Sequence, residues 1–139
     1  MKKWLYLTAA LAVVGILSRL PHPARDIAKL EPVQAVYLYM EDGTLNIETD
    51  TGDSGSGPSL TASYSDMRSK ADGEIFLDTA EYLILGPGVT ITPDFYDLLR
   101  PSCKVCICET RPDLEAASDY LHIHRPETDL AHLRCSGAP

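Results

Sequence analysis

Apolar and polar side chains alternate along residues 44–50 (TLNIETD), so one face of an extended segment there is apolar and the other face is polar and exposed to solvent. A second β-prone run, VQAVYLYM at 33–40, precedes it, and Asp42 and Gly43 lie between the two runs. Both of these residues tolerate the positive φ that a tight turn requires. The pattern therefore predicts an antiparallel β-hairpin.

The apolar run YLIL at 82–85 contains no charged position, which is typical of a strand covered on both faces. Thr92 can then cap a helix, because a proline and an aspartate follow it directly. KVCICE at 104–109 is a second buried-strand pattern, and Thr110 begins a capping-box sequence for a helix that runs to about Leu121. This order of strand, helix, strand and helix predicts parallel strands joined by a crossover.

These elements define the predicted fold class as α/β with a mixed sheet. The expected architecture is an N-terminal β-hairpin followed by a βαβα unit, with helices packed on the sheet and a hydrophobic helix preceding the domain. We expect a single mixed α/β domain over residues 33–124, with a further helical segment over 60–70. Residues 21–32 are expected to be a connector, and residues 125–139 a polar C-terminal tail.

Residues 1–20 have the features of an export segment. Two lysines follow the first methionine, and the 14 residues of 4–17 carry no charge. The run is short for a helix that spans a bilayer. It also lacks the small residues of a usual cleavage site, and for this second reason we favour an uncleaved anchor and leave a cleaved signal peptide open. The first cysteine is Cys103, which excludes lipoprotein processing. The expected location is the cell membrane, with the soluble part extracytoplasmic.

The chain beyond residue 20 is strongly acidic. Lys2, Lys3 and Arg19 are the only charged residues before it, so nine basic and 20 acidic residues remain, a net charge of −11. Nucleic acid and anionic lipid head groups are both polyanions, so the negative charge argues against either as a partner of this part. A solvated acidic surface is the simplest interpretation.

The stretch TGDSGSGPSL at 51–60 contains the Gly-Asp-Ser-Gly that surrounds the nucleophile of chymotrypsin-like serine proteases. A hydrolase with Ser54 as nucleophile would need a histidine and then an aspartate earlier in the chain. Only His22 precedes it, and Ser56 interrupts the motif before its Gly-Pro. Three glycines, three serines and a proline among residues 51–59 instead predict a flexible surface loop in which nothing chemical depends on Ser54.

Cysteine and histidine suggest a second candidate chemistry. A zinc site with two ligands of each type is conceivable, formed by Cys106, Cys108, His122 and His124. Against it, Cys103 lies on the other face of the predicted strand, and buried thiols act as small hydrophobic groups. In an oxidising compartment, Cys135 could form a disulfide with one strand cysteine. Because neither these residues nor His132 completes a known motif, we expect no catalytic residue, no cofactor and no metal site.

Residues 73–121 resemble the N-terminal domain of the Ger(x)C proteins, the C subunits of spore germinant receptors. The resemblance rests on YLILG at 82–86, the helix end DFYDLLR at 94–100, the strand KVCICE and the helix DLEAASDYL at 113–121. Members of that family are exported lipoproteins with further domains, whereas this chain has no lipid-accepting cysteine. No functional residue can be transferred from the family.

The resemblance implies a membrane-associated, extracytoplasmic, non-enzymatic protein of the spore germination class. Its expected role is that of a protein-interaction module beside integral membrane protein subunits, held to the membrane by its N-terminal segment. The alternative is an exported metal- or redox-active protein that uses the cysteines and histidines.

Overall fold

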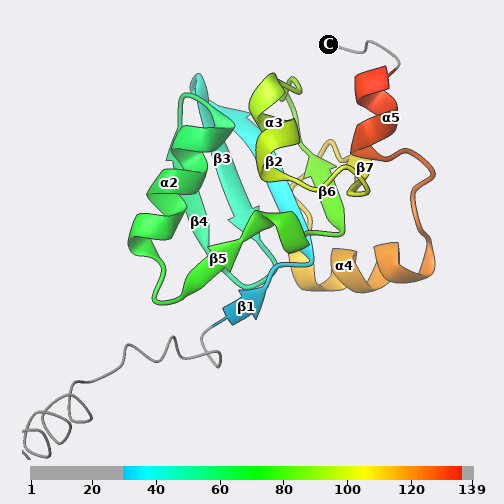
Figure 1. The fold of residues 1–139 in the computed structure, drawn as a ribbon, viewed down its shortest axis with the longest axis horizontal. Helices are drawn as coiled ribbons and strands as arrows, with labels where there is room; N and C mark the ends of the chain where they lie inside the picture. Colours follow the sequence, from blue (N-terminus) through cyan, green and yellow to red (C-terminus); the bar gives the residue numbers. More distant parts are fainter. Residues whose placement is uncertain (1–29, 136–139) are drawn as a thin grey trace, which may run out of the picture.

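The computed structural model describes residues 30–135, which form helices on both faces of a mixed five-stranded sheet (Figure 1). The strand order is β4-β3-β2-β6-β7, with bounds β2 Ala35–Glu41, β3 Thr44–Thr49, β4 Ser54–Gly57, β6 Tyr82–Leu85 and β7 Lys104–Ile107. The α-helices are α2 Leu60–Lys70, α3 Pro93–Leu98, α4 Leu114–Ile123 and α5 Leu130–Cys135. A short parallel pair, β1 Leu30–Pro32 with β5 Glu74–Phe76, and the 3-10 turn η2 Leu77–Thr79 complete the described elements.

The predicted hairpin is confirmed as the antiparallel pair β2 and β3. Its turn residues Asp42 and Gly43 have φ values of 50° and 76°, which only small or locally hydrogen-bonding residues adopt readily. The predicted parallel arrangement is also confirmed, because β6 pairs in parallel with β2 on one side and with β7 on the other. The mixed α/β sheet of the sequence analysis is therefore the observed one.

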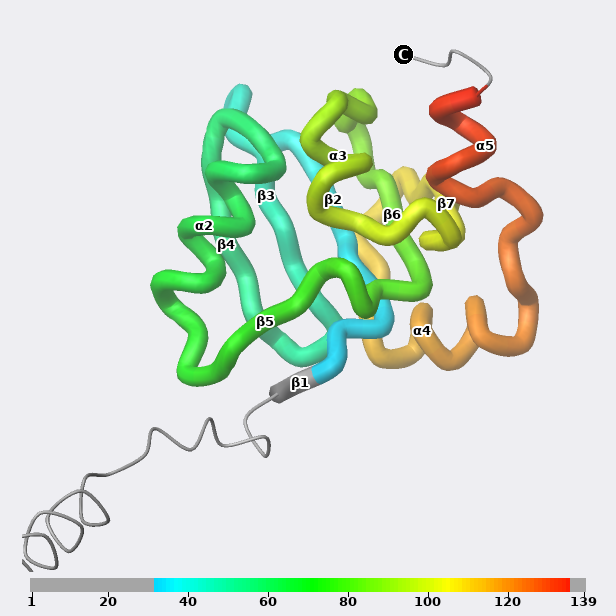
Figure 2. The backbone as a smooth tube through the Cα atoms, in the orientation of Figure 1, coloured from blue at the N-terminus to red at the C-terminus, as the bar shows by residue number. Residues whose placement is uncertain are grey.

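The sheet separates two apolar clusters. α2 and α3 lie side by side on one face, as Figure 2 shows, and their buried side chains Leu60, Met67 and Phe95 join the larger cluster. α4 lies on the opposite face, where Leu121 packs in a smaller cluster. β2 and β6 supply residues to both clusters, which explains why their sequences are almost continuously apolar.

The prediction of a loop over residues 51–59 is wrong, because Ser54–Gly57 form the edge strand β4 beside β3. The two glycines of this strand face α2. A Cβ on Gly55 would lie 2.3 Å from the carbonyl oxygen of Ser63 and 2.5 Å from the backbone nitrogen of Met67. The glycines thus allow α2 to lie directly on the strand, and Ser54 and Ser56, which alternate with them, point outward.

The start of α4 also differs from its prediction. Asp113 caps the helix by accepting hydrogen bonds from the amides of Glu115 and Ala116, so the helix begins three residues after the expected start. Pro112 explains the shift, since the residue before a proline disfavours helical geometry.

Residues 125–139 were expected to form a polar tail, but their described part contains α5. Its first residue, Leu130, is fully buried in the larger cluster. Its amide donates to the carbonyl oxygen of Cys103, 2.9 Å away.

The expected hydrophobic helix over residues 1–20 and most of the connector lie outside the described residues. Within residues 30–135, no helix is both long enough and apolar enough to span a bilayer.

Candidate functional site

Ser54 lies at the outer edge of the sheet with an exposed side chain. Among residues 30–135, its hydroxyl makes no hydrogen bond, so it is not hydrogen-bonded to a described base. A serine nucleophile depends on such a base and on fixed donors for the oxyanion. The arrangement gives the hydrolase hypothesis no support.

The strand cysteines divide between the two faces of the sheet, as predicted. Cys103 is buried in the larger cluster, whereas Cys106 and Cys108 pack half-buried against the smaller one. Burial raises the pKa of the Cys103 thiol to about 12, and burial followed by the nearby Cys108 raises the pKa of Cys106. Protonated thiols are poor nucleophiles and poor metal ligands. All four cysteines are free, including the exposed Cys135 on α5.

The structure does not assemble the conceivable zinc site. His122 and His124 are exposed at the end of α4, where the ring of His124 contacts the ring of Tyr120 in a tilted arrangement, at a centroid distance of 4.6 Å and an interplanar angle of 35°. Within the described range, no three His, Cys, Asp or Glu side chains are grouped so as to hold a metal ion.

A polar cluster on the α4 side of the sheet connects two distant parts of the chain. The Arg111 guanidinium donates from Nε and Nη2 to Oε2 of Glu48, at 3.1 Å and 2.9 Å, and its Nη2 lies 2.8 Å from the other carboxylate oxygen, Oε1. The Tyr39 hydroxyl donates to the same carboxylate at 3.2 Å, and its ring stacks on Tyr37. Burial, and then the Glu48 charge, raise the pKa of Tyr39. Every member has a partner, so this cluster fixes the segment before α4 against the sheet.

An apolar groove of about 620 Å³ lies at the carboxyl ends of β6 and β7. We call it the β7 groove. Its apolar lining comes from both strands, from the segment that precedes α3 and from α5: Leu85, Val89, Ile91, Val105, Ile107 and Leu133. In open α/β sheets, ligands commonly bind outside the carboxyl ends of the parallel strands. The β7 groove lies at that end of the parallel strands, beside the edge strand β7.

Ile107 stands at the rim of the β7 groove with 81% of its surface exposed. The outer edge of β7 is covered only at its start, where the Val105 amide donates to Thr128 and the Leu130 amide donates to Cys103. The Ile107 amide points outward in the alternation of the strand, and no hydrogen bond from it is formed within residues 30–135. β7 thus offers a solvent-exposed apolar side chain next to an open backbone edge.

Two further apolar side chains are exposed on α4. Tyr120 and Ile123 have exposed fractions of 61% and 76%. Single exposed apolar residues are common on protein surfaces. Neither residue lines the β7 groove, so Ile123 offers a control for Ile107 on a different element.

Comparison with known protein families, with curated proteins and with solved structures found no match for the chain.

Sequence reasoning did not identify the β7 groove, because its lining is spread over residues 85–133 and contains no motif. One signal was available in the strand pattern itself. Ile107 stands between Cys106 and Cys108 in an apolar run that predicts a buried strand. An edge position for that strand would have turned Ile107 from a core residue into a surface one.

Proposed function

We propose that the chain is a non-catalytic protein-interaction module, held at the outer face of a membrane by its N-terminal segment. Its partner is an integral membrane protein, which contributes an extended extracytoplasmic segment to the open edge of β7. A role in spore germination belongs to this proposal through the resemblance over residues 73–121. One observation carries the interaction function: Ile107 is 81% exposed beside an apolar groove and an unpaired strand edge.

The chemistry of the β7 groove defines what the partner segment must supply. An added strand would donate and accept main-chain hydrogen bonds along β7 beyond Val105, where residues 128–130 no longer cover the edge. Alternate side chains of that strand would point into the groove, so an apolar residue is required there. The strongly acidic chain favours a neutral or basic segment over an acidic one.

Site-specific photo-crosslinking in the membrane of the producing cell tests this proposal. A photoreactive amino acid replaces Ile107 in the full chain, and a matched variant carries it at Ile123, which is 76% exposed on α4. We expect position 107 to crosslink to an extracytoplasmic segment of a membrane protein and position 123 to give little product. Equal crosslinking at both positions, crosslinking only to a second copy of the chain, or none at position 107 would refute the proposal.

The orientation is tested separately with the exposed thiol of Cys135. A membrane-impermeant maleimide should label it in intact cells as fully as in lysed cells. Labelling only after lysis would place the domain on the cytoplasmic side and overturn the extracytoplasmic assignment.

A further inference from the structure

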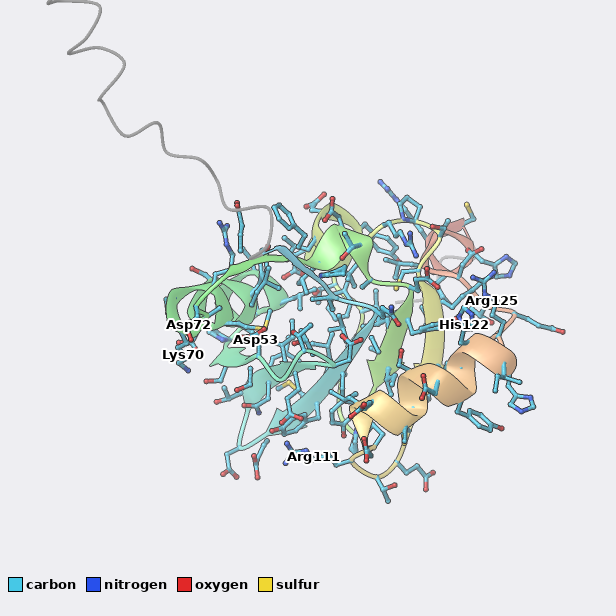
Figure 3. The ribbon with its side chains drawn as sticks, turned by 90° about the horizontal axis from the view of Figure 1, so that it is seen from below. Asp53, Lys70, Asp72, Arg111, His122 and Arg125 are labelled. Atoms are coloured by element: carbon cyan, nitrogen blue, oxygen red, sulfur yellow. The ribbon has the colours of Figure 1, made fainter. Side chains whose placement is uncertain are left out.

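A charged cavity of about 340 Å³ lies at the opposite ends of the same two strands. Its lining surrounds the first residues of β6 and β7 and comprises Glu81, Tyr82, Arg100, Ser102, Lys104, Arg125 and Asp129. We call it the amino-end cavity. Figure 3 shows Arg125 beyond the end of α4, far from Arg111 at its start. The cavity is therefore separate from both the Glu48–Arg111 pair and the β7 groove.

Positive charge is concentrated in this cavity although the chain is acidic. Residues 30–135 contain seven Lys and Arg residues, and three of them, Arg100, Lys104 and Arg125, line it. Two carboxylates, Glu81 and Asp129, face these three cations. One positive charge therefore remains unbalanced by the lining.

The ion pairs in the cavity are long. Glu81 lies 3.6 Å from Arg100 and 3.6 Å from Arg125, and Lys104 lies 3.8 Å from Asp129. Elsewhere in the same structure, Lys70 approaches Asp66 to 2.6 Å and Arg111 approaches Glu48 to 2.8 Å. The cavity cations therefore keep donor capacity that their own carboxylates do not use.

Two buried polar atoms in the lining support the same conclusion. Tyr82 is 1% exposed, and its hydroxyl oxygen has no hydrogen-bond partner among the described residues. A hydrogen-bonding contact with Tyr82 is the largest cause of the raised pKa of Arg125, although the contact falls short of full hydrogen-bond geometry, so the hydroxyl keeps its own proton free to donate. The Nε of Arg100 is buried and unpartnered as well. Such groups are costly in a folded protein unless a ligand or water satisfies them.

We propose that the amino-end cavity binds a small organic anion through a single carboxylate group. The two guanidinium groups and the Lys104 ammonium supply the charge, and the Tyr82 hydroxyl donates a further hydrogen bond. One carboxylate neutralises the one unbalanced charge, whereas a phosphate dianion would exceed it. The volume lies at the lower end of the range for ligand pockets, which suits a small molecule.

The test is a titration of the full chain, labelled with ¹⁵N in neutral-detergent micelles at pH 7 and low salt. Acetate and benzoate are the probes, benzamide is the uncharged analogue of benzoate, and inorganic phosphate is the competing anion. The amide signals of Tyr82 and Lys104 report the cavity. We expect saturable shifts with both carboxylates, none with benzamide, and weaker binding of phosphate.

Variants separate binding at the cavity from general attraction of anions. Arg125→Gln removes a cation whose side chain is 63% exposed and should weaken benzoate binding about tenfold without affecting folding. Arg134→Gln removes the same charge outside the cavity and should leave binding unchanged. Tyr82→Phe should also weaken binding about tenfold, while the melting temperature stays equal or rises because an unpartnered buried hydroxyl is gone.

Each contrary outcome would overturn the proposal. Unsaturable shifts, or equal responses to benzoate and benzamide, would show that no carboxylate site exists. Equal losses of benzoate affinity in the Arg125 and Arg134 variants would show that binding depends on the overall charge of the protein and not on the cavity. Tighter binding of phosphate than of benzoate would reject the single-carboxylate assignment, and unchanged binding in Tyr82→Phe would remove its hydroxyl from the site.

Discussion

Replacing Gly55 by alanine tests whether α2 rests directly on β4. The added Cβ would lie 2.3 Å from the Ser63 carbonyl oxygen, 2.5 Å from the Met67 nitrogen and 2.7 Å from the Met67 Cβ. The first two are helix backbone atoms, so they cannot turn aside as a flexible side chain can. α2 must therefore move away from the sheet by about 1 Å to restore ordinary van der Waals contact.

The expected loss of stability follows from three effects. Overpacking of a well-packed interior costs about 1–3 kcal/mol. Displacement of α2 also uncovers part of Leu60 and Met67, which are fully buried. Alanine offsets about 0.5–1 kcal/mol of this, because glycine is the poorer strand residue and loses more entropy on folding. The net expectation is a free energy of unfolding lower by about 2 kcal/mol, which corresponds to a melting temperature lower by about 10 °C.

Urea unfolding of the full chain, followed by far-ultraviolet circular dichroism, measures this change. Ser54→Ala is the matched control, because its side chain is exposed on the same strand and should alter stability by less than about 0.5 kcal/mol. Gly52→Ala isolates backbone strain, since Gly52 has a φ of 91° and open space around its Cβ position, and should cost about 1 kcal/mol. If Gly55→Ala were as stable as Ser54→Ala, the close packing of α2 on β4 would be refuted.

Three further measurements test the environment of individual side chains. Burial acts to raise the pKa of Asp94, but hydrogen bonds from two threonines outweigh the effect of burial and hold the pKa below its usual range. The ionised Asp94 carboxylate therefore stabilises the fold, and this contribution is lost as pH falls through the folded-state pKa. Asp94→Asn should accordingly reduce the dependence of unfolding free energy on pH between about 2 and 5, and an unchanged acid limb would contradict this. A maleimide at pH 8 should modify Cys135 rapidly and Cys103 only after unfolding, because burial raises the Cys103 pKa to about 12; equal rates in the native protein would contradict its burial. Glu48→Gln should lower stability by about 1 kcal/mol or less in urea titrations, since the Arg111 partner is largely exposed, and a loss of several kcal/mol would show stronger coupling.

The elements with strong local signals were predictable from sequence. The turn at Asp42 and Gly43 needs positive φ, and these residue types meet that need wherever they occur. The strand at 82–85 is apolar throughout because helices cover both of its faces. In both cases, the local pattern and the tertiary environment favour the same structure.

β4 was not predictable in the same way. Its sequence SGSG contains no residue that favours a strand, and glycine and serine usually indicate a loop. Its structure comes from its neighbours, since β3 supplies the hydrogen-bonding edge and α2 needs the space that Gly55 and Gly57 leave free. The sequence that resembles a protease motif is thus explained by packing, because glycines occupy the inward positions of β4 and serines occupy the outward positions.

The amino-end cavity was beyond sequence reasoning for a different reason. Arg100 follows α3, Lys104 begins β7 and Arg125 follows α4, so no spacing in the chain links them. The parallel order of β6 and β7 brings these points to one end of the sheet. Only topology could have placed them together, and the sequence contained no signal for the unpartnered Tyr82 hydroxyl.

The two edges of the sheet differ in how they meet solvent, and the difference bears on the proposed interaction. β4 exposes only serine side chains at its edge. β7 exposes Ile107, which lies beyond the part of the strand edge that residues 128–130 cover. Burial of one isoleucine contributes roughly 1.5–3 kcal/mol. The loss of translational and rotational freedom on association costs at least about 4 kcal/mol. A contact with Ile107 alone is therefore too weak, and a stable partner must also pair with the strand edge and fill the β7 groove.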